Sequence, residues 1–273
     1  MLLAHQPYFA YYGVMEEITV GCCQFHPELG DRKVNIDRMI EYIGEGSKHH
    51  IDVLLFPELI TTGYLGARSI RELCEPVTGP WVKELAVAAG ENRTGIVFGF
   101  AEEDNGRCYN SACFVLPSGE IAGVYRKTHL WDTERKWASP GDSFPVFNFP
   151  GAAVAGWICY DTRFPEAARK AASAGGEVAF VPTAWLGPAR EWYLALQARA
   201  LDNNIFTAGA DIIQPEIGCT GVSLITGPDG DIIAAADEGK EGIISASLQP
   251  SRRDERLKRM NLLKDRRLDL YGG

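Results

Sequence analysis

The fold is indicated most directly by residues 153–174, AVAGWICYDTRFPEAARKAASA. The first six residues are small or apolar, as in a strand that is buried on both faces. Small residues at three- and four-residue spacing then predict a helix from Pro165 to Ala174. Cys159 closes the apolar run and therefore lies at the turn between strand and helix. A strand that leads into a helix is the building unit of α/β proteins.

The same alternation recurs along the rest of the chain. Strand-like apolar runs occupy residues 18–25, 53–56, 95–100, 111–116, 153–159, 178–181, 205–210, 221–225 and 243–247. Helical patterns occupy residues 32–47, 81–90, 165–174 and 189–203. Turn sequences at residues 116–120 and 226–231 predict hairpins, which join antiparallel strands. We therefore expect an α/β protein with mixed sheets.

The composition is that of an ordinary globular protein with 273 residues, of which 46% are hydrophobic and 23% are charged. The net charge of -9 would repel phosphate backbones and anionic lipid, so nucleic acid and membranes are not expected partners. Seven cysteines, an odd number with no CxxC pair, favour a reducing compartment without a disulfide framework. Because no signal peptide or membrane-spanning run is evident, we expect a cytoplasmic protein.

No linker or repeat divides the chain, so residues 15–273 are expected to form a single domain. Residues 1–14 show no clear period and are interpreted as an extra N-terminal tail, with Met15 as a possible natural start. The charged stretch at about 251–273 is interpreted as a C-terminal arm, either a solvated helix or a segment that docks on another subunit.

Three polar residues follow predicted strands and are candidates for catalysis. Cys159 lies at a position where helix N–H groups and the helix dipole favour a thiolate and an oxyanion. Glu58 follows the apolar run 53–57, where burial would raise its pKa toward the range that a general base needs. Lys127, seven residues before Glu134, follows a predicted hairpin and could bind an oxyanion. Taken singly, each residue could also have no catalytic role. Cys159 could be a buried inert thiol, Glu58 a solvated loop carboxylate and Lys127 a solvated lysine.

The histidines give no sign of a metal site. The chain has five, and none has the HExxH or a similar spacing. His129 is the one histidine in a candidate site region, and we expect it to pack or to cap backbone groups. We therefore expect no metal and no cofactor.

Three sequence motifs, in the order Glu, Lys, Cys, resemble those of the nitrilase superfamily of carbon–nitrogen hydrolases, in an amidase-like branch. The motifs are FPE at 56–58 with TGY at 62–64, YRKTHL at 125–130 with Glu134 and PG at 140–141, and CYDTRFPE at 159–166. The likeness extends over nearly the whole chain from Ile18 onward. It implies a four-layer αββα sandwich with two mixed β-sheets, and a homodimer or higher even oligomer stacked as αββααββα.

The resemblance also implies roles for the candidate residues. Glu58 would be the general base, Cys159 the nucleophile that forms a thioester, and Lys127 a stabiliser of the tetrahedral intermediate. Glu134 would be a second catalytic carboxylate, and the N–H of Tyr160 would complete the oxyanion hole. The expected reaction is hydrolysis of a small linear amide to a carboxylic acid and ammonia.

The sequence defines the substrate less sharply than the reaction. Nitrilases of the family have Trp-Glu after the nucleophile, whereas this chain has Tyr160 and Asp161, which favours an amide over a nitrile. N-carbamoyl compounds, omega-amides and nitriles stay as alternatives. Tyr64, Tyr160 and Trp185 are the expected substrate-binding residues, with Trp131 a weaker candidate.

Aromatic walls without a free arginine favour a neutral, fairly apolar amide, and Arg163 is expected to pair with a local carboxylate. Two other classes of function stay open. One is a binding module on the same fold. The other is a glutaminase that feeds ammonia to a synthetase, although no GxxxxGK[ST] motif is present.

Overall fold

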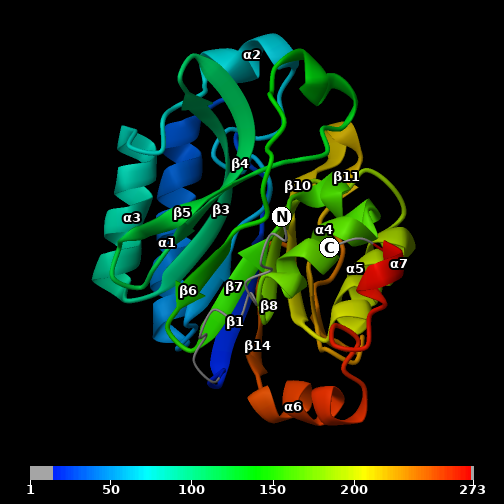
Figure 1. The fold of residues 1–273 in the computed structure, drawn as a ribbon. Coiled ribbons are helices and arrows are strands. Elements are labelled where there is room, and N and C mark those ends of the chain that lie inside the picture. The colour runs from blue at the N-terminus through cyan, green and yellow to red at the C-terminus, as the bar shows by residue number, and fades with distance from the viewer. Residues whose placement is uncertain (1–14, 272–273) are drawn as a thin grey trace.

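The computed structural model describes residues 15–271, in which two six-stranded sheets lie face to face between helices (Figure 1). The predicted tail, residues 1–14, lies outside the described residues. The strands of the first sheet, in spatial order, are β14 (Gly242–Leu248), β1 (Ile18–Gln24), β2 (Val53–Leu55), β3 (Gly95–Asp104), β4 (Arg107–Val115) and β5 (Ile121–Arg126). Those of the second are β13 (Ile232–Ala235), β12 (Leu224–Thr226), β9 (Phe206–Asp211), β8 (Val178–Thr183), β7 (Ala152–Gly156) and β6 (Val146–Phe149).

Helices cover the outer face of each sheet. The helices are α1 (Arg32–Lys48), α2 (Ala67–Glu72), α3 (Pro80–Asn92), α4 (Pro165–Ser173), α5 (Ala189–Asn203), α6 (Pro250–Arg259) and α7 (Leu268–Tyr271). Helices α1 and α3 lie on the first sheet and α4 and α5 on the second, so that the layers run α, β, β, α across Figure 1. A short pair, β10 (Ile213–Gln214) and β11 (Cys219–Thr220), lies outside the two sheets.

Both sheets are mixed, and each has a parallel centre. Strands β1, β2 and β3 run parallel, as do β7, β8 and β9, while the outer strands add antiparallel pairs. Parallel strands need long crossovers, which α1 and α3 supply in the first sheet and α4 and α5 in the second. The predicted α/β class with two mixed sheets is therefore confirmed, whereas stacking of two sandwiches in a dimer stays a prediction.

The core is divided by the alternation of side chains along each strand. Val53 and Leu55 point into the layer between the two sheets, whereas Leu54 and Phe56 pack against α1 and α3. Because both faces are covered, the central strands read as continuous apolar runs rather than as alternating ones.

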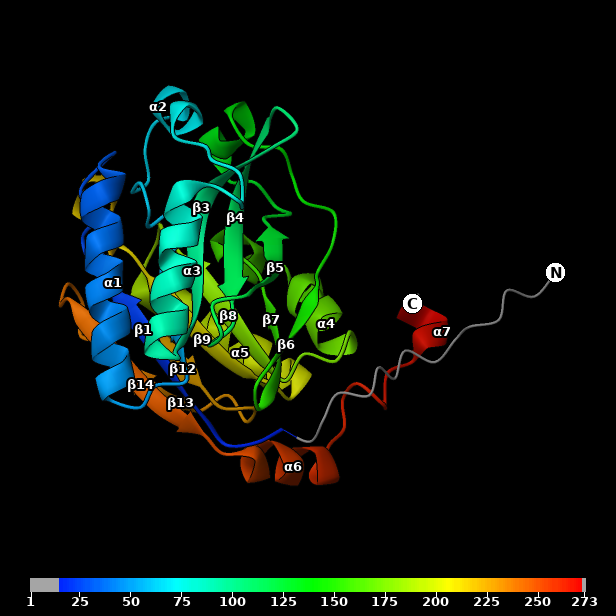
Figure 2. The same cartoon turned by 90° about the vertical axis from the view of Figure 1, so that its left-hand side faces the viewer.

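The C-terminal segment leaves the sandwich. Helix α6 contains no buried residue, and Figure 2 shows α6 and α7 lying beside the four layers rather than within them. Within residues 15–271, no helix is long and apolar enough to cross a membrane.

The sequence pattern located the central elements well and missed the peripheral ones. Helix α5 has the predicted bounds, and both expected hairpins join antiparallel strands, β4 to β5 and β12 to β13. Strand β6 was not predicted, and β5 and β13 were implied only by the hairpin turns before them, because these strands are short or half-exposed and have weak apolar patterns. The strand predicted to end at Cys159 ends at Gly156, and a 3-10 helix, Cys159–Arg163, begins with the cysteine.

Candidate active site

The candidate residues meet where strands of both sheets end. Glu58 follows β2, Lys127 follows β5, and Cys159 follows β7, each within three residues of the strand's last residue. Strand β8 ends at Thr183, and the next residue, Ala184, lies against both Glu58 and Cys159. The carboxyl ends of parallel strands are the usual place for sites in α/β folds, and the two facing sheets here supply such ends from both sides.

Glu58 is completely buried, unlike the solvated carboxylate that its loop position alone suggests. Its Oε1 accepts hydrogen bonds from Lys127 Nζ at 2.6 Å and Asn110 Nδ2 at 2.7 Å, and its Oε2 accepts from the Ala184 N–H at 2.9 Å. Gly99 permits this placement, because a Cβ there would lie 2.6 Å from the Cα of Glu58 and 2.5 Å from the backbone N of Leu59. Such a contact is too short for any side chain, so glycine is required.

Lys127 joins two buried carboxylates. Its Nζ lies 2.7 Å from Glu134 Oε1 in addition to its contact with Glu58, and all three side chains are at most 1% exposed. Glu134 lies in a 3-10 helix, Asp132–Lys136, whose first turn is closed by the Trp131 N–H donating to Glu134 Oε2 at 2.7 Å. A buried charge is tolerated only when it is paired and hydrogen-bonded, and here one cation serves two anions.

Two further side chains complete this network. Asn110 Nδ2 donates to Glu58 and, at 3.0 Å, to Glu134 Oε1, so the amide bridges the two carboxylates. The Tyr64 hydroxyl donates to the same Glu134 oxygen at 2.8 Å. Tyr64 thus reaches the carboxylate pair while its ring lines the pocket. Asn110 was not predicted as a site residue, although a buried amide within the apolar strand β4 is a detectable signal.

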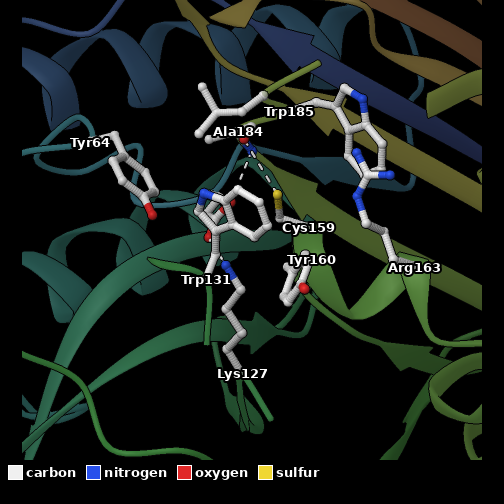
Figure 3. Close-up of a pocket in the computed structure, with 10 residues that line it drawn as sticks. Tyr64, Lys127, Trp131, Cys159, Tyr160, Arg163, Ala184 and Trp185 are labelled. Carbon is white, nitrogen blue, oxygen red and sulfur yellow. Dashed lines mark hydrogen bonds and ion pairs between the residues drawn. The ribbon is translucent and has the colours of Figure 1, made fainter. Parts of the chain in front are cut away.

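Cys159 begins the 3-10 helix with an unusual backbone conformation. Its φ is +42°, a region that residues other than glycine rarely adopt and that is found at functional turns. The Sγ–H donates to the carbonyl oxygen of Ala184 at 3.4 Å. One peptide residue, Ala184, therefore contacts the thiol through its oxygen and Glu58 through its N–H (Figure 3). The α-helix begins at Pro165, as expected. The N–H groups next to the cysteine therefore belong to the 3-10 helix and not to the α-helix.

Burial and charge set the protonation of the three groups. Burial raises the pKa of Glu58 to about 7 against the opposing charge of Lys127, and Glu134 adds to the rise. Burial alone would lower the pKa of Lys127, but the two carboxylates outweigh it and hold that pKa well above its ordinary value. Burial also raises the pKa of the Cys159 thiol, and the charge of Glu58 raises it further while Lys127 lowers it. These effects disfavour loss of the thiol proton in the resting site, so a base that takes it during attack is needed.

Asp161 fixes the turn that carries the cysteine. Its buried carboxylate accepts hydrogen bonds from the Ile158 N–H at 3.1 Å, the Tyr125 hydroxyl at 2.6 Å and the Thr128 hydroxyl at 2.8 Å. It also lies 2.7 Å from His129 Nδ1, and this contact raises the pKa of His129. His129 packs, as expected, with its ring stacked on Phe164, and it also pairs with Asp161, which was not expected. The carboxylate thus ties the nucleophile's turn to the loop after Lys127.

A pocket opens beside the thiol. Its lining residues are Glu58, Tyr64, Lys127, Trp131, Cys159, Tyr160, Arg163, Ala184, Trp185 and Leu186. Figure 3 shows Tyr64 and Lys127 on one side of Cys159, and Trp185 with Arg163 on the other. All three expected substrate-binding residues, Tyr64, Tyr160 and Trp185, thus line this cavity, and so does Trp131.

All seven cysteines are free thiols, and Cys159 is the one that lines the pocket together with Glu58 and Lys127. Burial raises the pKa of Cys22, Cys23, Cys113 and Cys219, as it does that of Cys159. Among residues 15–271, no group of three or more His, Cys, Asp or Glu side chains is arranged to hold a metal ion.

The sequence and the fold resemble those of known proteins. The sequence profile of the carbon–nitrogen hydrolase family matches residues 19–256. The chain is 36% identical over 265 residues to a probable nitrilase of Schizosaccharomyces pombe, covering 93% of this chain and 97% of the relative. It is 34% identical over 262 residues to 2-oxoglutaramate amidase of Bacillus subtilis, covering 93% and 99%. Nit3 of Saccharomyces cerevisiae, a member of branch 10 of the nitrilase superfamily, superposes with a TM-score of 0.86 at 25% identity, covering 94% and 99%.

These matches define the class of protein as a hydrolase that acts on carbon–nitrogen bonds, and the chain belongs to the carbon–nitrogen hydrolase family. Within it, the chain lies in the amidase-like part of the nitrilase superfamily, so the resemblance drawn from the three motifs is confirmed. The prediction of an enzyme acting on carbon–nitrogen bonds other than peptide bonds is confirmed as well.

Proposed function

We propose that the protein hydrolyses a small linear amide to a carboxylic acid and ammonia through a thioester on Cys159, with Glu58 and Lys127 as its catalytic partners. The observation that carries this proposal is the arrangement of Glu58, which is buried, accepts a hydrogen bond from Lys127 and, like the Cys159 thiol, contacts Ala184. The pocket beside the thiol is lined by Glu58, Lys127 and Cys159.

In the proposed acylation, Glu58 takes the proton from the Cys159 thiol as the sulfur adds to the amide carbon. The oxyanion rests between the Lys127 ammonium and the Tyr160 N–H. Loss of one such donor costs about 3 kcal/mol, or about a hundredfold in rate. The intermediate collapses as Glu58 returns the proton to the departing nitrogen, so that ammonia leaves and a thioester remains.

In the proposed deacylation, Glu58 takes a proton from water, which attacks the thioester carbon. The second tetrahedral intermediate releases the carboxylic acid, and the sulfur recovers its proton. A pKa of about 7 for Glu58 suits both directions of transfer, because the group is then neither a very weak base nor a very weak acid near neutral pH.

Glu134 is proposed to act through Lys127 and Glu58. Its negative charge raises the pKa of Glu58, and its contact at 2.7 Å keeps the ammonium in place and charged. Asn110 donates hydrogen bonds to both carboxylates and Tyr64 donates one to Glu134, so we assign Asn110 and Tyr64 positioning roles.

Ammonia release from matched amides, N-carbamoyl compounds and nitriles tests this proposal, with Cys159→Ala as the paired variant. We expect release from amides and its loss in the variant. Release from nitriles alone would assign the chain to nitrile hydrolysis, and release from carbamoyl compounds alone would support that alternative. Equal release by both proteins would remove Cys159 from the mechanism.

The quaternary structure is also a proposal. Large apolar side chains are exposed on the second sheet's helix layer and on the C-terminal segment, namely Leu194, Leu201, Leu268, Leu270 and Tyr271. Contiguous apolar patches are typical of subunit contacts. We propose a homodimer in which these side chains contact the second copy, and light scattering coupled to size exclusion tests it, since a monomeric mass would contradict it.

A further inference from the structure

One wall of the candidate pocket carries an arginine, Arg163, that forms an ion pair with Glu191. Arg163, in the 3-10 helix that begins with Cys159, lines the cavity beside Trp185 and Leu186. Its guanidinium lies 4.4 Å from the centre of the Trp185 ring, and Figure 3 shows the two groups together on the side of Cys159 away from Lys127. The stacked ring holds the guanidinium at one place on the pocket wall.

The partner of this cation comes from the start of α5. Glu191, in the first turn of that helix, accepts a hydrogen bond from Arg163 at 3.0 Å. A carboxylate in a first helical turn interacts favourably with the helix dipole, which helps to keep Glu191 in place. Gly187 lies beside the pair, since a Cβ there would be in ordinary contact with the guanidinium at 3.6 Å and the carboxylate at 3.8 Å.

The rest of the pocket offers no second cation for a charged substrate group. The other positive group that lines it is Lys127, and its charge is shared by Glu58 and Glu134. The remaining walls are the rings of Tyr64, Trp131, Tyr160 and Trp185, with Leu186. A carboxylate on the substrate would therefore meet aromatic surface, or an arginine that already has its anion.

We propose, resting on the amidase function proposed above, that Glu191 is a specificity-determining residue: by occupying Arg163 it restricts the pocket to amides with neutral, apolar acyl groups and disfavours amides whose acyl group carries a carboxylate. A free arginine would bind such a carboxylate through two parallel N–H donors. With Glu191 present, the substrate must displace that side chain or lie next to its negative charge.

The solvent exposure of the Arg163–Glu191 ion pair sets how strongly the pocket can discriminate between neutral and charged amides. The side chains of Arg163 and Glu191 are 38% and 51% exposed, and ion pairs this exposed are weak. Unmasking the arginine should therefore change selectivity by about tenfold, which is about 1.4 kcal/mol, rather than by thousands.

The test compares chain-matched substrates. The monoamides of succinic, glutaric and adipic acid are paired with butyramide, valeramide and hexanamide, and kcat/KM is measured by ammonia release. For the unmodified protein we expect the neutral amide to be preferred at every length. Glu191→Gln, which keeps the side chain's size, should raise the ratio of charged to neutral kcat/KM by about tenfold at the length that reaches Arg163, through a lower KM.

Matched variants separate this effect from a structural one. Arg163→Gln combined with Glu191→Gln should lose the gain, and Glu191→Asp should partly restore the original ratio. Glu166→Gln changes the net charge equally at an exposed site on α4 and should leave the ratio unchanged. Added salt should shrink the gain, because the contact is exposed.

Three results would overturn the inference. One is an unmodified protein that already prefers the monoamides of dicarboxylic acids. Another is a Glu191→Gln protein whose ratio is unchanged at all three lengths, and a third is a gain that survives the loss of Arg163. These differ from failure of the proposed function, in which neither amide series releases ammonia from the unmodified protein and both proposals fall together.

Discussion

The pH dependence of Glu134→Gln tests how the buried charges work together. Glu58 and Glu134 each accept a hydrogen bond from Lys127 Nζ, at 2.6 and 2.7 Å, which places their oxygens close to each other. Two like charges about 5 Å apart repel by about 3 kcal/mol at an effective dielectric constant of about 20, which corresponds to about two pH units. Removing the charge of Glu134 should therefore lower the pKa of Glu58 from about 7 toward about 5.

The sign of the effect on rate follows from the role of the base. Glu58 must be ionised to accept the thiol proton, so kcat/KM of the unmodified protein should fall as the pH drops through about 7. In Glu134→Gln the whole profile is lower, because a partner of Lys127 is lost, but its acid limb should move to lower pH by one to two units, on the order of the repulsion. The pH profile separates the two effects, because the loss of activity lowers the plateau whereas the change in the pKa of Glu58 moves the acid limb.

The assay is the pH profile of kcat/KM, which reports ionisations of the free enzyme. The rate of Cys159 alkylation by iodoacetamide supplies a second profile that needs no turnover. Glu166→Gln is the control, since Glu166 is exposed and outside the network. An acid limb that stays in place in Glu134→Gln, or moves to higher pH, would show that Glu134 does not raise the pKa of Glu58.

Other predictions concern the surroundings of the site. Tyr64→Phe removes a hydrogen bond of 2.8 Å to the second buried carboxylate and should lower kcat/KM by about three- to tenfold, whereas an unchanged value would remove its positioning role. Gly99→Ala should displace Glu58 and reduce activity strongly, whereas Gly66→Ala, with open space around the new Cβ, should not; equal activities would contradict this. Burial raises the pKa of Asp211 from 3.8 to about 8, so the folded state should lose stability as the pH rises between these values. Asp211→Asn should flatten that slope in urea titrations, and an unchanged slope would exclude Asp211 as its cause.

The sequence was sufficient for the framework of the fold because its centre is buried on both faces. Runs such as residues 178–181 and 205–210 are almost entirely apolar, and such a run predicts a buried strand whichever elements pack against it. The outer strands were lost because half-exposed strands tolerate polar residues and glycine. Strand β5, with Gly123 in its middle, is the clearest case.

Residues of the site were predictable where a polar side chain follows an apolar run. Glu58 and Cys159 could be singled out in this way, and their order with Lys127 supplied the rest. The contribution of Ala184 could not be seen, because it acts through its backbone N–H and carbonyl. Nor could the partner of Arg163 be named, since Glu191 lies 28 residues further along the chain and approaches only in the folded protein.

Detection of an acyl group on Cys159 tests the proposed thioester mechanism most directly. The protein is mixed with an amide that it turns over, quenched in acid within the first turnovers, and analysed by intact mass and by peptide mapping. We expect an added mass equal to the acyl group, located on the peptide that contains Cys159 and absent from Cys159→Ala. An adduct on any of the other six thiols, or turnover that persists in Cys159→Ala without an adduct, would contradict the proposed mechanism.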